Sequence, residues 1–353
     1  MGDIMTETNQ KILDMILKNA TTNEISSATG LSNKQLFYRL NLLKAKGYNF
    51  SKKYYDDGEI TYKLQKGIQA QKEISLITSP KNQQIRLVFI SDLHLASIKD
   101  RVDLLNQVYE FCSKEGIHII INSGDMVDGF LGYATKKYTS FEQQIEYMLK
   151  VYPYDKNILN FTCLGNHEAD ALERTGQNLE TILEIKRHDI IPLGYGIGKL
   201  KIKNDEIIIK HPKTNLSKNV DISNNNLVIY GHSHRAKTEV HENRVNLFVP
   251  TLSDLQCHQG VFPGFMKATI EFYNGIFING NFEQYIMIDK IYKINESSYD
   301  LYYGKDLEQK AIKYEEDRDV LKKEQPNKQK EKKLIQQNSR LSQIDKFNKR
   351  YNK

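Results

Sequence analysis

An acid and a histidine two positions apart follow an apolar run in this sequence, and they are the residues best suited to chemistry. Residues 87–90 are wholly apolar, and Asp92 and His94 come directly after them. Such a run is typical of a buried parallel strand, and open α/β sheets place their ligands just beyond the carboxyl ends of such strands. A carboxylate and an imidazole together suit zinc, iron and manganese. A single pair could equally be a turn acid with a capping role, so the rest of the chain decides.

The same arrangement recurs four times further along the chain. Largely apolar runs at residues 117–121, 158–164, 207–209 and 227–230 are each followed by side chains that can bind metals. The blocks that follow them are Gly124-Asp125-Met126-Val127-Asp128-Gly129, Gly165-Asn166-His167-Glu168, Lys210-His211 and Gly231-His232-Ser233-His234. His118 lies inside the second run, so we interpret it as a structural histidine. Five strands that end in such residues predict one shared metal centre.

The order of these blocks resembles that of the calcineurin-like metallophosphoesterases over roughly residues 85–290. The resemblance implies an α/β fold in which a two-sheet β-sandwich is flanked by helices. It implies a first metal held by Asp92, His94, Asp125 and His234, and a second metal held by Asp125, Asn166, His211 and His232. Asp125 would bridge the two ions, and His167 would lie beside the substrate phosphate. Asp128 and Glu168 are expected to orient ligands rather than to bind metal.

These residue types suit the hydrolysis of a phosphoester by a metal-bound hydroxide. Two metal ions about 3.5–4 Å apart can clamp both the attacking and the leaving oxygen, and they can lower the pKa of a bound water from about 15.7 to about 7. Asp125 would hold that spacing, and the neutral oxygen of Asn166 would leave the ions electrophilic. His167 could stabilise the phosphoryl charge or protonate the leaving oxygen. We therefore expect Asp92, Asp125 and His167 to be catalytic, with two divalent ions: Mn²⁺ in the first place, or Fe or Zn.

Residues 1–66 are predicted to form a separate unit that resembles a winged helix-turn-helix. Two short helices ending before Gly30 precede a third helix, for which Asn33 is a candidate cap. Residues 54–62 then predict a hairpin that turns at Asp57-Gly58. The polar side of the third helix carries residue types that reach phosphates and bases: Lys34, Gln35, Tyr38, Arg39 and Lys44. DNA binding is the preferred interpretation, with a protein-docking module or a solvated basic face as alternatives.

Residues 67–84 are predicted to be a polar linker, and residues 85–294 the catalytic domain. Helices are expected at 102–111, 141–152 and 179–186, and strands at 245–250, 266–272, 276–278 and 285–288. His188 follows the third of these helices and is expected to interact with its dipole. A loop before the second helix is either plain surface or a basic-aromatic lip for nucleic acid. Its candidate residues are Tyr133, Lys136, Lys137 and Tyr138.

Residues 295–353 are predicted to be a charged basic tail, either helical or disordered. From 305 onward the tail carries 15 Lys or Arg and 9 Asp or Glu, a surplus that equals the net charge of +6 of the whole chain. The tail could touch a phosphate backbone, or it could simply be solvated. The three cysteines, Cys112, Cys163 and Cys257, are widely spaced and odd in number. This number and spacing indicate reduced thiols and a cytoplasmic protein. Because no run of about 18 apolar residues is present, we expect no membrane contact.

Together these features predict a dinuclear metal-dependent phosphoesterase that hydrolyses phosphodiester bonds, with nucleic acid as the expected substrate. A phosphomonoester, a small diester or a cyclic nucleotide is the main alternative. The resemblance implies that protein phosphatases of this superfamily place arginines beside the phosphate. Because no arginine follows the block Gly165-Asn166-His167-Glu168, a protein phosphatase is less favoured. A further alternative is a DNA-bound regulator whose phosphoesterase domain acts only as a scaffold. The complete ligand set argues against that last possibility.

Overall fold

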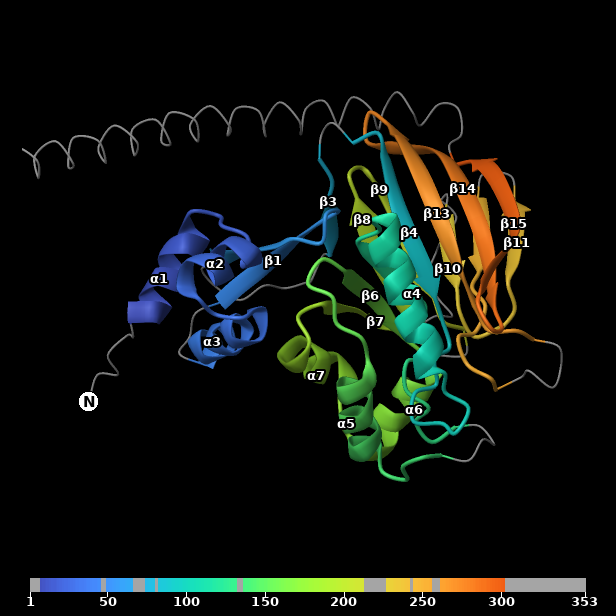
Figure 1. Cartoon of the computed structure of the whole chain (residues 1–353), viewed down its shortest axis with the longest axis horizontal. Coiled ribbons are helices and arrows are strands. Elements are labelled where there is room, and N and C mark those ends of the chain that lie inside the picture. Colours follow the sequence, from blue (N-terminus) through green and yellow to red (C-terminus); the bar gives the residue numbers. More distant parts are fainter. Residues whose placement is uncertain are drawn as a thin grey trace, which may run out of the picture.

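Two sheets packed face to face form the body of the protein in the computed structural model (Figure 1). The structure describes residues 7–45, 49–65, 74–79, 82–131, 136–212, 227–241, 244–255 and 261–301. A large apolar core draws on both sheets, with Phe89 and Phe161 from one and Ile209 and Ile229 from the other. The fold is therefore the mixed α/β, two-sheet sandwich that the sequence predicts.

The first sheet has seven strands, in the order β15-β14-β13-β4-β5-β6-β7. Its four central strands β4 to β7 are parallel, whereas β13, β14 and β15 add antiparallel pairs at one side. The strands are β4 (Gln84–Ile90), β5 (Ile119–Asn122), β6 (Leu159–Leu164), β7 (Ile190–Tyr195), β13 (Gly264–Tyr273), β14 (Ile276–Met287) and β15 (Ile291–Asp300).

Helices cover the outer face of this sheet. Leu87 and Phe89 of β4 point into the core between the sheets, while Val88 and Ile90 join a second apolar cluster with the helices. This alternation follows from the two-residue period of a strand. The helices are α4 (Val102–Glu115), α5 (Phe141–Val151), α6 (Asn166–Thr175) and α7 (Leu179–Lys186). They link successive parallel strands, as expected of βαβ units.

The second sheet has eight strands, in the order β11-β12-β10-β9-β8-β3-β1-β2. Strands β9, β10 and β12 are parallel neighbours, while β8 runs antiparallel to β9. The strands are β1 (Asn49–Tyr55), β2 (Ile60–Gln65), β3 (Ser75–Ile77), β8 (Ile197–Ile202), β9 (Asp205–Lys210), β10 (Leu227–Tyr230), β11 (Lys237–His241) and β12 (Arg244–Phe248).

The N-terminal unit contains the three helices and the hairpin that the sequence predicts: α1 (Glu7–Leu17), α2 (Thr22–Thr29), α3 (Asn33–Ala45) and the pair β1–β2. Gly30 ends α2 in a left-handed conformation, and Gly58 makes the hairpin turn with φ of 82°. The predicted cap of α3 was wrong. Ser32 caps this helix instead, since its hydroxyl accepts from the Gln35 N–H and its own N–H donates to the Gln35 side chain.

The hairpin of this unit is part of the second sheet, which the sequence did not predict. Strand β1 pairs in parallel with β3, and β3 pairs in parallel with β8 (Figure 1). Residues 74–79 and 84, assigned to a polar linker, contain β3 and the start of β4, and Ile74 and Leu76 are buried. Tyr54 of β1 also meets Phe161 of β6 edge-on, with ring centroids 5.5 Å apart. The boundary at residue 66 stays a prediction, but it does not separate two cores.

The C-terminal boundary of the catalytic part also needs correction. Strand β15 runs from Ile291 to Asp300, so the predicted change at 294/295 falls inside a strand. Residues 302–353, the rest of the predicted tail, lie outside the described residues.

Cys112 and Cys163 are free and buried, and burial raises the pKa of the Cys112 thiol to about 12. Cys257 lies outside the described residues. Among the described helices, none has the length and apolar character needed to cross a bilayer.

The N-terminal unit also touches the catalytic part through a histidine. The His188 ring lies 5.0 Å from the Phe37 ring of α3 and 5.9 Å from that of Tyr154, measured between centroids. Burial lowers the pKa of His188 to about 4; Asp189 opposes this change, and Lys52 and Arg187 add to it. His188 is therefore neutral at pH 7, and its predicted interaction with the helix dipole stays a prediction.

Removing residues 1–66 should destabilise the remaining protein rather than release an independent domain. The deletion takes away β1 and β2, so β3 loses its neighbour, and Phe161 loses its contact with Tyr54. Fully burying one large apolar side chain is worth about 1.5–3 kcal/mol, so we expect the free energy of unfolding to fall by at least about 2 kcal/mol. Urea denaturation of the full-length and shortened chains measures this. Equal stability would mean that the shared core contributes nothing.

The stability of the protein should decrease as the pH falls from about 6.5 to about 4. His188 binds a proton near pH 6.5 when unfolded but only near pH 4 when folded. In that window the unfolded state binds more protons, so acid favours unfolding. Because His188 is partly exposed, we expect a loss of about 1–2 kcal/mol, less than the pKa difference alone implies. Urea denaturation at pH 7.5 and 4.5 should show a smaller loss for His188→Gln; an unchanged pH dependence would contradict this.

Candidate metal centre

The predicted ligands lie together at the carboxyl ends of strands from both sheets. Asp92 and Asp125 follow β4 and β5, and Asn166 begins α6 directly after β6. From the opposite sheet, His211 follows β9 and His232 follows β10. Backbone hydrogen bonds tie the loops to one another: the Asp92 N–H donates to the Gly124 carbonyl at 2.9 Å, and the His94 N–H donates to the Asp125 carbonyl at 3.0 Å.

A first cluster consists of Asp92, His94 and His234. The His94 and His234 Nε2 atoms are 3.3 Å apart, and His234 Nε2 lies 3.3 Å from Asp92 Oδ1. All three residues are buried. The ring of His94 also lies edge-on to that of His167, with centroids 4.6 Å apart.

A second cluster consists of Asp125, His211 and His232. His211 Nε2 lies 3.0 Å from Asp125 Oδ2 and 3.1 Å from the Asn166 side-chain oxygen. The rings of His211 and His232 have centroids 5.2 Å apart. Asp125 and His211 are buried, whereas Asn166 and His232 are only partly covered. The second cluster is therefore the side of the centre that solvent reaches.

The spacing of these atoms fits divalent metal ions. Bonds of about 2.0–2.2 Å from an ion to its ligands place neighbouring ligand atoms about 3.0–3.5 Å apart, and the four separations above lie between 3.0 and 3.3 Å. Asp92 Oδ1 and Asp125 Oδ2 are buried, and the nearest partners of these oxygens are His234 Nε2 at 3.3 Å and His211 Nε2 at 3.0 Å. An oxygen in that position is stabilised by a cation. The assignment of each ligand to one of two ions, and the bridging role of Asp125, stay predictions.

Several ligands have a backbone conformation that side chains rarely adopt. The φ angles are positive at Asp92 (52°), His94 (42°), Asp125 (50°), His232 (70°) and His234 (59°). Such conformations cost of order 1–3 kcal/mol each, and they cluster at functional sites. Here they turn the chain sharply after each strand, which directs consecutive ligands toward one point.

Glycines next to the ligands leave room for this convergence. A Cβ added to Gly124 would lie 2.2 Å from His211 Nδ1, and one added to Gly165 would lie 2.1 Å from Asp125 Oδ1. Neither position tolerates a side chain unless a ligand moves. The glycine of each block is therefore part of the site, although it binds nothing itself.

The electrostatics of the centre favour bound positive charge. Burial raises the pKa of Asp125, but His211 and His167 outweigh it and hold that pKa well below its usual range. Asp92 is likewise buried, and His234 lowers its pKa below the usual value. Burial lowers the pKa of His211, yet the Asp125 carboxylate raises it to about 10. A metal ion and a proton thus compete for the same atoms.

His167 lies against the second carboxylate with one nitrogen directed into the centre. Its Nδ1–H donates to the Asp128 carbonyl at 2.5 Å, so Nε2 is the atom on the side of Asp125, 3.8 Å from Oδ2. The His167 backbone N–H donates to Asp125 Oδ1 at 3.1 Å. Because His167 is in the first turn of α6, the positive end of that helix also faces the centre, which favours an anion.

Of the two residues predicted to orient ligands, Asp128 contacts a ligand side chain, whereas Glu168 contacts the backbone of two neighbouring loops. Asp128 Oδ1 lies 3.4 Å from His94 Nδ1, and Lys136 donates to Asp128 Oδ2 at 2.6 Å. Glu168 accepts from the Val127 and Gly165 N–H groups at 2.7 Å each, which joins the loop after β5 to the start of α6. Burial and the nearby Asp125 raise the pKa of Glu168 to about 7.

Several supporting groups were not identified from the sequence. His211 Nδ1 donates to the Ser123 carbonyl at 2.8 Å, which leaves Nε2 directed at Asp125. The Ser91 hydroxyl donates to Asp92 Oδ2 at 2.5 Å, and the Thr251 hydroxyl donates to the Asp92 carbonyl at 2.8 Å. A backbone carbonyl carries no sequence signal, and serine and threonine are too common to stand out.

Of the two interpretations of the loop before α5, the described residues favour a plain surface loop over a basic-aromatic lip. Lys136 pairs with Asp128, and Lys137 pairs with Asp100 at 2.6 Å, so both cations are neutralised within the protein. Tyr138 lies against Tyr147, with ring centroids 5.4 Å apart. Tyr133 lies outside the described residues.

The residues predicted to contact nucleic acid lie on α3, away from both metal clusters. Lys34, Gln35 and Tyr38 are exposed and Arg39 is half-buried, while the side chain of Lys44 lies outside the described residues. His118 also stays outside the clusters, and its Nδ1 is 3.0 Å from the Asn157 carbonyl. It is structural, as the sequence predicts.

One family model matches part of the chain. Residues 85–236 match the sequence model of a family described as calcineurin-like phosphoesterase. No curated protein sequence matches the chain significantly.

Similar solved structures share little sequence with the chain. One is vacuolar protein sorting 29 from Cryptosporidium parvum, with 13% identity over 62% of this chain and 100% of that one, at a TM-score of 0.38. A novel archaeal phosphodiesterase has 15% identity over 60% and 100%, at a TM-score of 0.37. YfcE, a phosphoesterase from E. coli, has 15% identity over 56% and 98%, at a TM-score of 0.35.

Replacing Gly165 with alanine should weaken metal binding while the fold persists. The added Cβ would lie 2.1 Å from Asp125 Oδ1 and 2.7 Å from the Asp125 nitrogen, so Asp125 has to move. Displacing groups that orient ligands typically lowers metal affinity 10–100-fold, and we expect a loss of about that size. Titration calorimetry with Mn²⁺ measures it.

Gly176→Ala, at the other end of α6, is the matched control. Its Cβ would meet nothing within 4 Å, but its φ of 71° disfavours alanine. This variant should lose about 1 kcal/mol of stability and keep its metal affinity. Equal metal affinity in both variants would contradict the role given to Gly165.

Proposed function

We propose that the calcineurin-like phosphoesterase domain at residues 85–236 is a hydrolase that cleaves phosphodiester bonds with two divalent metal ions, and that nucleic acid is its substrate. The observation that carries this proposal is the pair of clusters, Asp92–His94–His234 and Asp125–His211–His232, with His167 near both. The His167 ring lies 4.6 Å from that of His94, and its Nε2 lies 3.8 Å from Asp125 Oδ2. Two clusters with one histidine beside them suit two cations and a phosphate bound to them.

The chain's own residues would bind and orient the phosphate. The start of α6 offers its positive end, and His167 Nε2 can donate a hydrogen bond to a phosphoryl or leaving oxygen. Asp125, which accepts a hydrogen bond from the His167 N–H, would bridge the two ions and set their separation. When bound, two divalent ions would supply Lewis acidity toward the phosphate and a water of lowered pKa. Asp92, His94, His234, Asn166, His211 and His232 would hold these ions with Asp125.

Mn²⁺ is the proposed metal, with Fe or Zn as alternatives, because the donor set contains imidazoles, carboxylates and one amide oxygen but no thiolate. A cytoplasmic location is part of the proposal, supported by the free buried thiols Cys112 and Cys163.

Nucleic acid is proposed as substrate because of what accompanies the metal centre. Lys34, Gln35 and Tyr38 leave the polar face of α3 exposed. Residues 305–353 add a surplus of basic charge equal to the net +6 of the chain. Basic residues of these types neutralise phosphates along a strand, and the resulting affinity depends on salt. The main competing substrate is a small phosphoester. Its hydrolysis would require neither the exposed face of α3 nor the basic charge of residues 305–353, so both would lack an explanation.

Purified protein with Mn²⁺ should hydrolyse single- or double-stranded DNA as well as bis-p-nitrophenyl phosphate. Asp125→Ala should lower kcat/KM for both substrates more than about hundredfold, beyond the effect of losing an outer-shell partner. His167→Gln should lower kcat by about 10²–10³, the range for one transition-state donor, and leave Mn²⁺ affinity nearly unchanged. Steady-state kinetics and Mn²⁺ calorimetry separate these two roles.

The outcomes divide the competing functions. Hydrolysis of the small ester alone would retain the phosphoesterase and move the substrate to a small molecule. DNA binding without hydrolysis of any ester, unaffected by Asp125→Ala, would favour the scaffold. Cleavage that survives Asp125→Ala would show a contaminating nuclease and overturn the proposal.

A further inference from the structure

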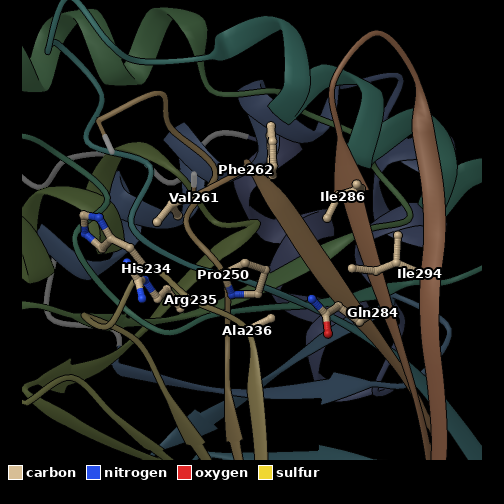
Figure 2. A pocket seen from close by; sticks show the side chains of 9 residues that line it. All are labelled: His234, Arg235, Ala236, Pro250, Val261, Phe262, Gln284, Ile286 and Ile294. Atoms are coloured by element: carbon tan, nitrogen blue, oxygen red, sulfur yellow. The ribbon is translucent and has the colours of Figure 1, made fainter. Parts of the chain in front are cut away.

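A pocket of about 310 Å³ opens beside the first metal cluster. Figure 2 shows its wall, formed by residues from the loop after β10, the segment around β12 and β13, and strands β14 and β15. The lining residues are His234, Arg235, Ala236, Pro250, Val261, Phe262, Gln284, Ile286 and Ile294. Ligand pockets in proteins usually measure about 300–1,000 Å³, so this one is at the small end.

The pocket and the metal centre share one residue, His234, at the edge of the pocket (Figure 2). This residue lines the pocket, and its Nε2 lies 3.3 Å from both Asp92 Oδ1 and His94 Nε2. A group esterified to a phosphate at the first cluster can therefore extend past His234 into the pocket. None of the residues already assigned to the reaction uses this space, apart from His234 itself.

The walls of the pocket are largely apolar, and two of the large apolar side chains that border it are exposed to solvent. Phe262 is 49% exposed and Ile294 is 50% exposed, and both border the pocket. Val261 and Pro250 beneath them are buried. An exposed phenylalanine beside an apolar floor is a surface on which a flat aromatic group can stack.

Two polar side chains at the edge limit what fits. Arg235 is exposed and makes no ion pair with the described residues. Gln284 is partly covered, and its amide, which can both donate and accept, points toward Pro250 and Ala236 across the pocket (Figure 2). A cation suits a neighbouring phosphate, and an amide suits the hydrogen-bonding edge of a base.

We propose that this pocket binds the base of the nucleotide that adjoins the reacting phosphate. Phe262 stacks on the base, Gln284 contacts its edge, and Arg235 contacts the adjoining phosphate. The inference rests on the proposed function and deepens it, because it names the part of the substrate that the domain recognises. An ester without a base leaves the pocket empty and gains nothing from it.

Two esters with the same leaving group test the pocket in the full-length protein with Mn²⁺. They are thymidine 5′-(p-nitrophenyl phosphate) and methyl p-nitrophenyl phosphate, which differ only in the nucleoside. Stacking of a base on an aromatic ring is worth about 1–3 kcal/mol, or roughly 5- to 150-fold. We expect kcat/KM to favour the thymidine ester, and Phe262→Ala to reduce that preference at least about fivefold. Gln284→Ala should reduce it about two- to tenfold.

Tyr273→Ala is the matched control, because Tyr273 is an aromatic residue on β13 with 56% exposure that does not line the pocket. This variant should retain the wild-type preference. A preference that Phe262→Ala leaves intact, or an equal loss for both esters, would overturn the proposal while the phosphoesterase remains.

If neither ester is hydrolysed, the pocket is judged by binding alone, and the hydrolysis of DNA decides the proposed function separately. Calorimetry of thymidine 5′-monophosphate against wild type, Phe262→Ala and Tyr273→Ala gives that answer. Binding that weakens at least about fivefold in Phe262→Ala only would support the pocket. Absent binding, or binding equal in all three proteins, would overturn it.

Discussion

Two carboxylates buried at the junction of two sheets are the constraint on which the rest of the structure depends. Asp92 and Asp125 are almost fully inaccessible to solvent. Burying an ionised carboxylate is strongly unfavourable unless positive charge or hydrogen bonds compensate. The compensation comes from both sheets: His211 faces Asp125, and His234 faces Asp92. The sandwich therefore has to close at this end for the charges to be tolerated.

The second constraint is the space around the two carboxylates, and it follows from their burial. Imidazoles can approach the carboxylates closely only if the chain turns sharply after each strand and carries no side chain at the turn. The positive φ angles of Asp92 and Asp125 provide the turn, while Gly124 and Gly165 provide the room. A site organised in this way has little freedom to relax, because the groups that would move are the ligands themselves.

The sequence predicted which side chains group into the two metal clusters, but it did not predict the contacts that surround these clusters. The difference has a physical reason. The ligand blocks each follow a strand within a few residues, so short-range pattern is enough to find them. Strands β1 and β3 pair through backbone hydrogen bonds, which any residue types could make, so no sequence pattern predicts the pairing. The register of such a pair also depends on the rest of the sheet. Ser123 orients His211 through a carbonyl that any residue could provide. The contact of His188 with Phe37 was not predicted, because it depends on tertiary packing.

The incorporation of the hairpin into the second sheet changes how the N-terminal helices are connected to the metal centre. The sheet order runs from β2 through β1, β3 and β8 to β9 and β10, and the last two strands end at His211 and His232. The helices are thus connected to the ligands through hydrogen-bonded strands, and Phe37 and His188 add a packed contact to α3. A flexible tether would let a bound strand reach the metals at many distances, with an effective concentration set by tether length. A rigid connection instead sets one distance between α3 and the centre, so any strand held by Lys34 and Tyr38 would meet the metals at a constant number of nucleotides.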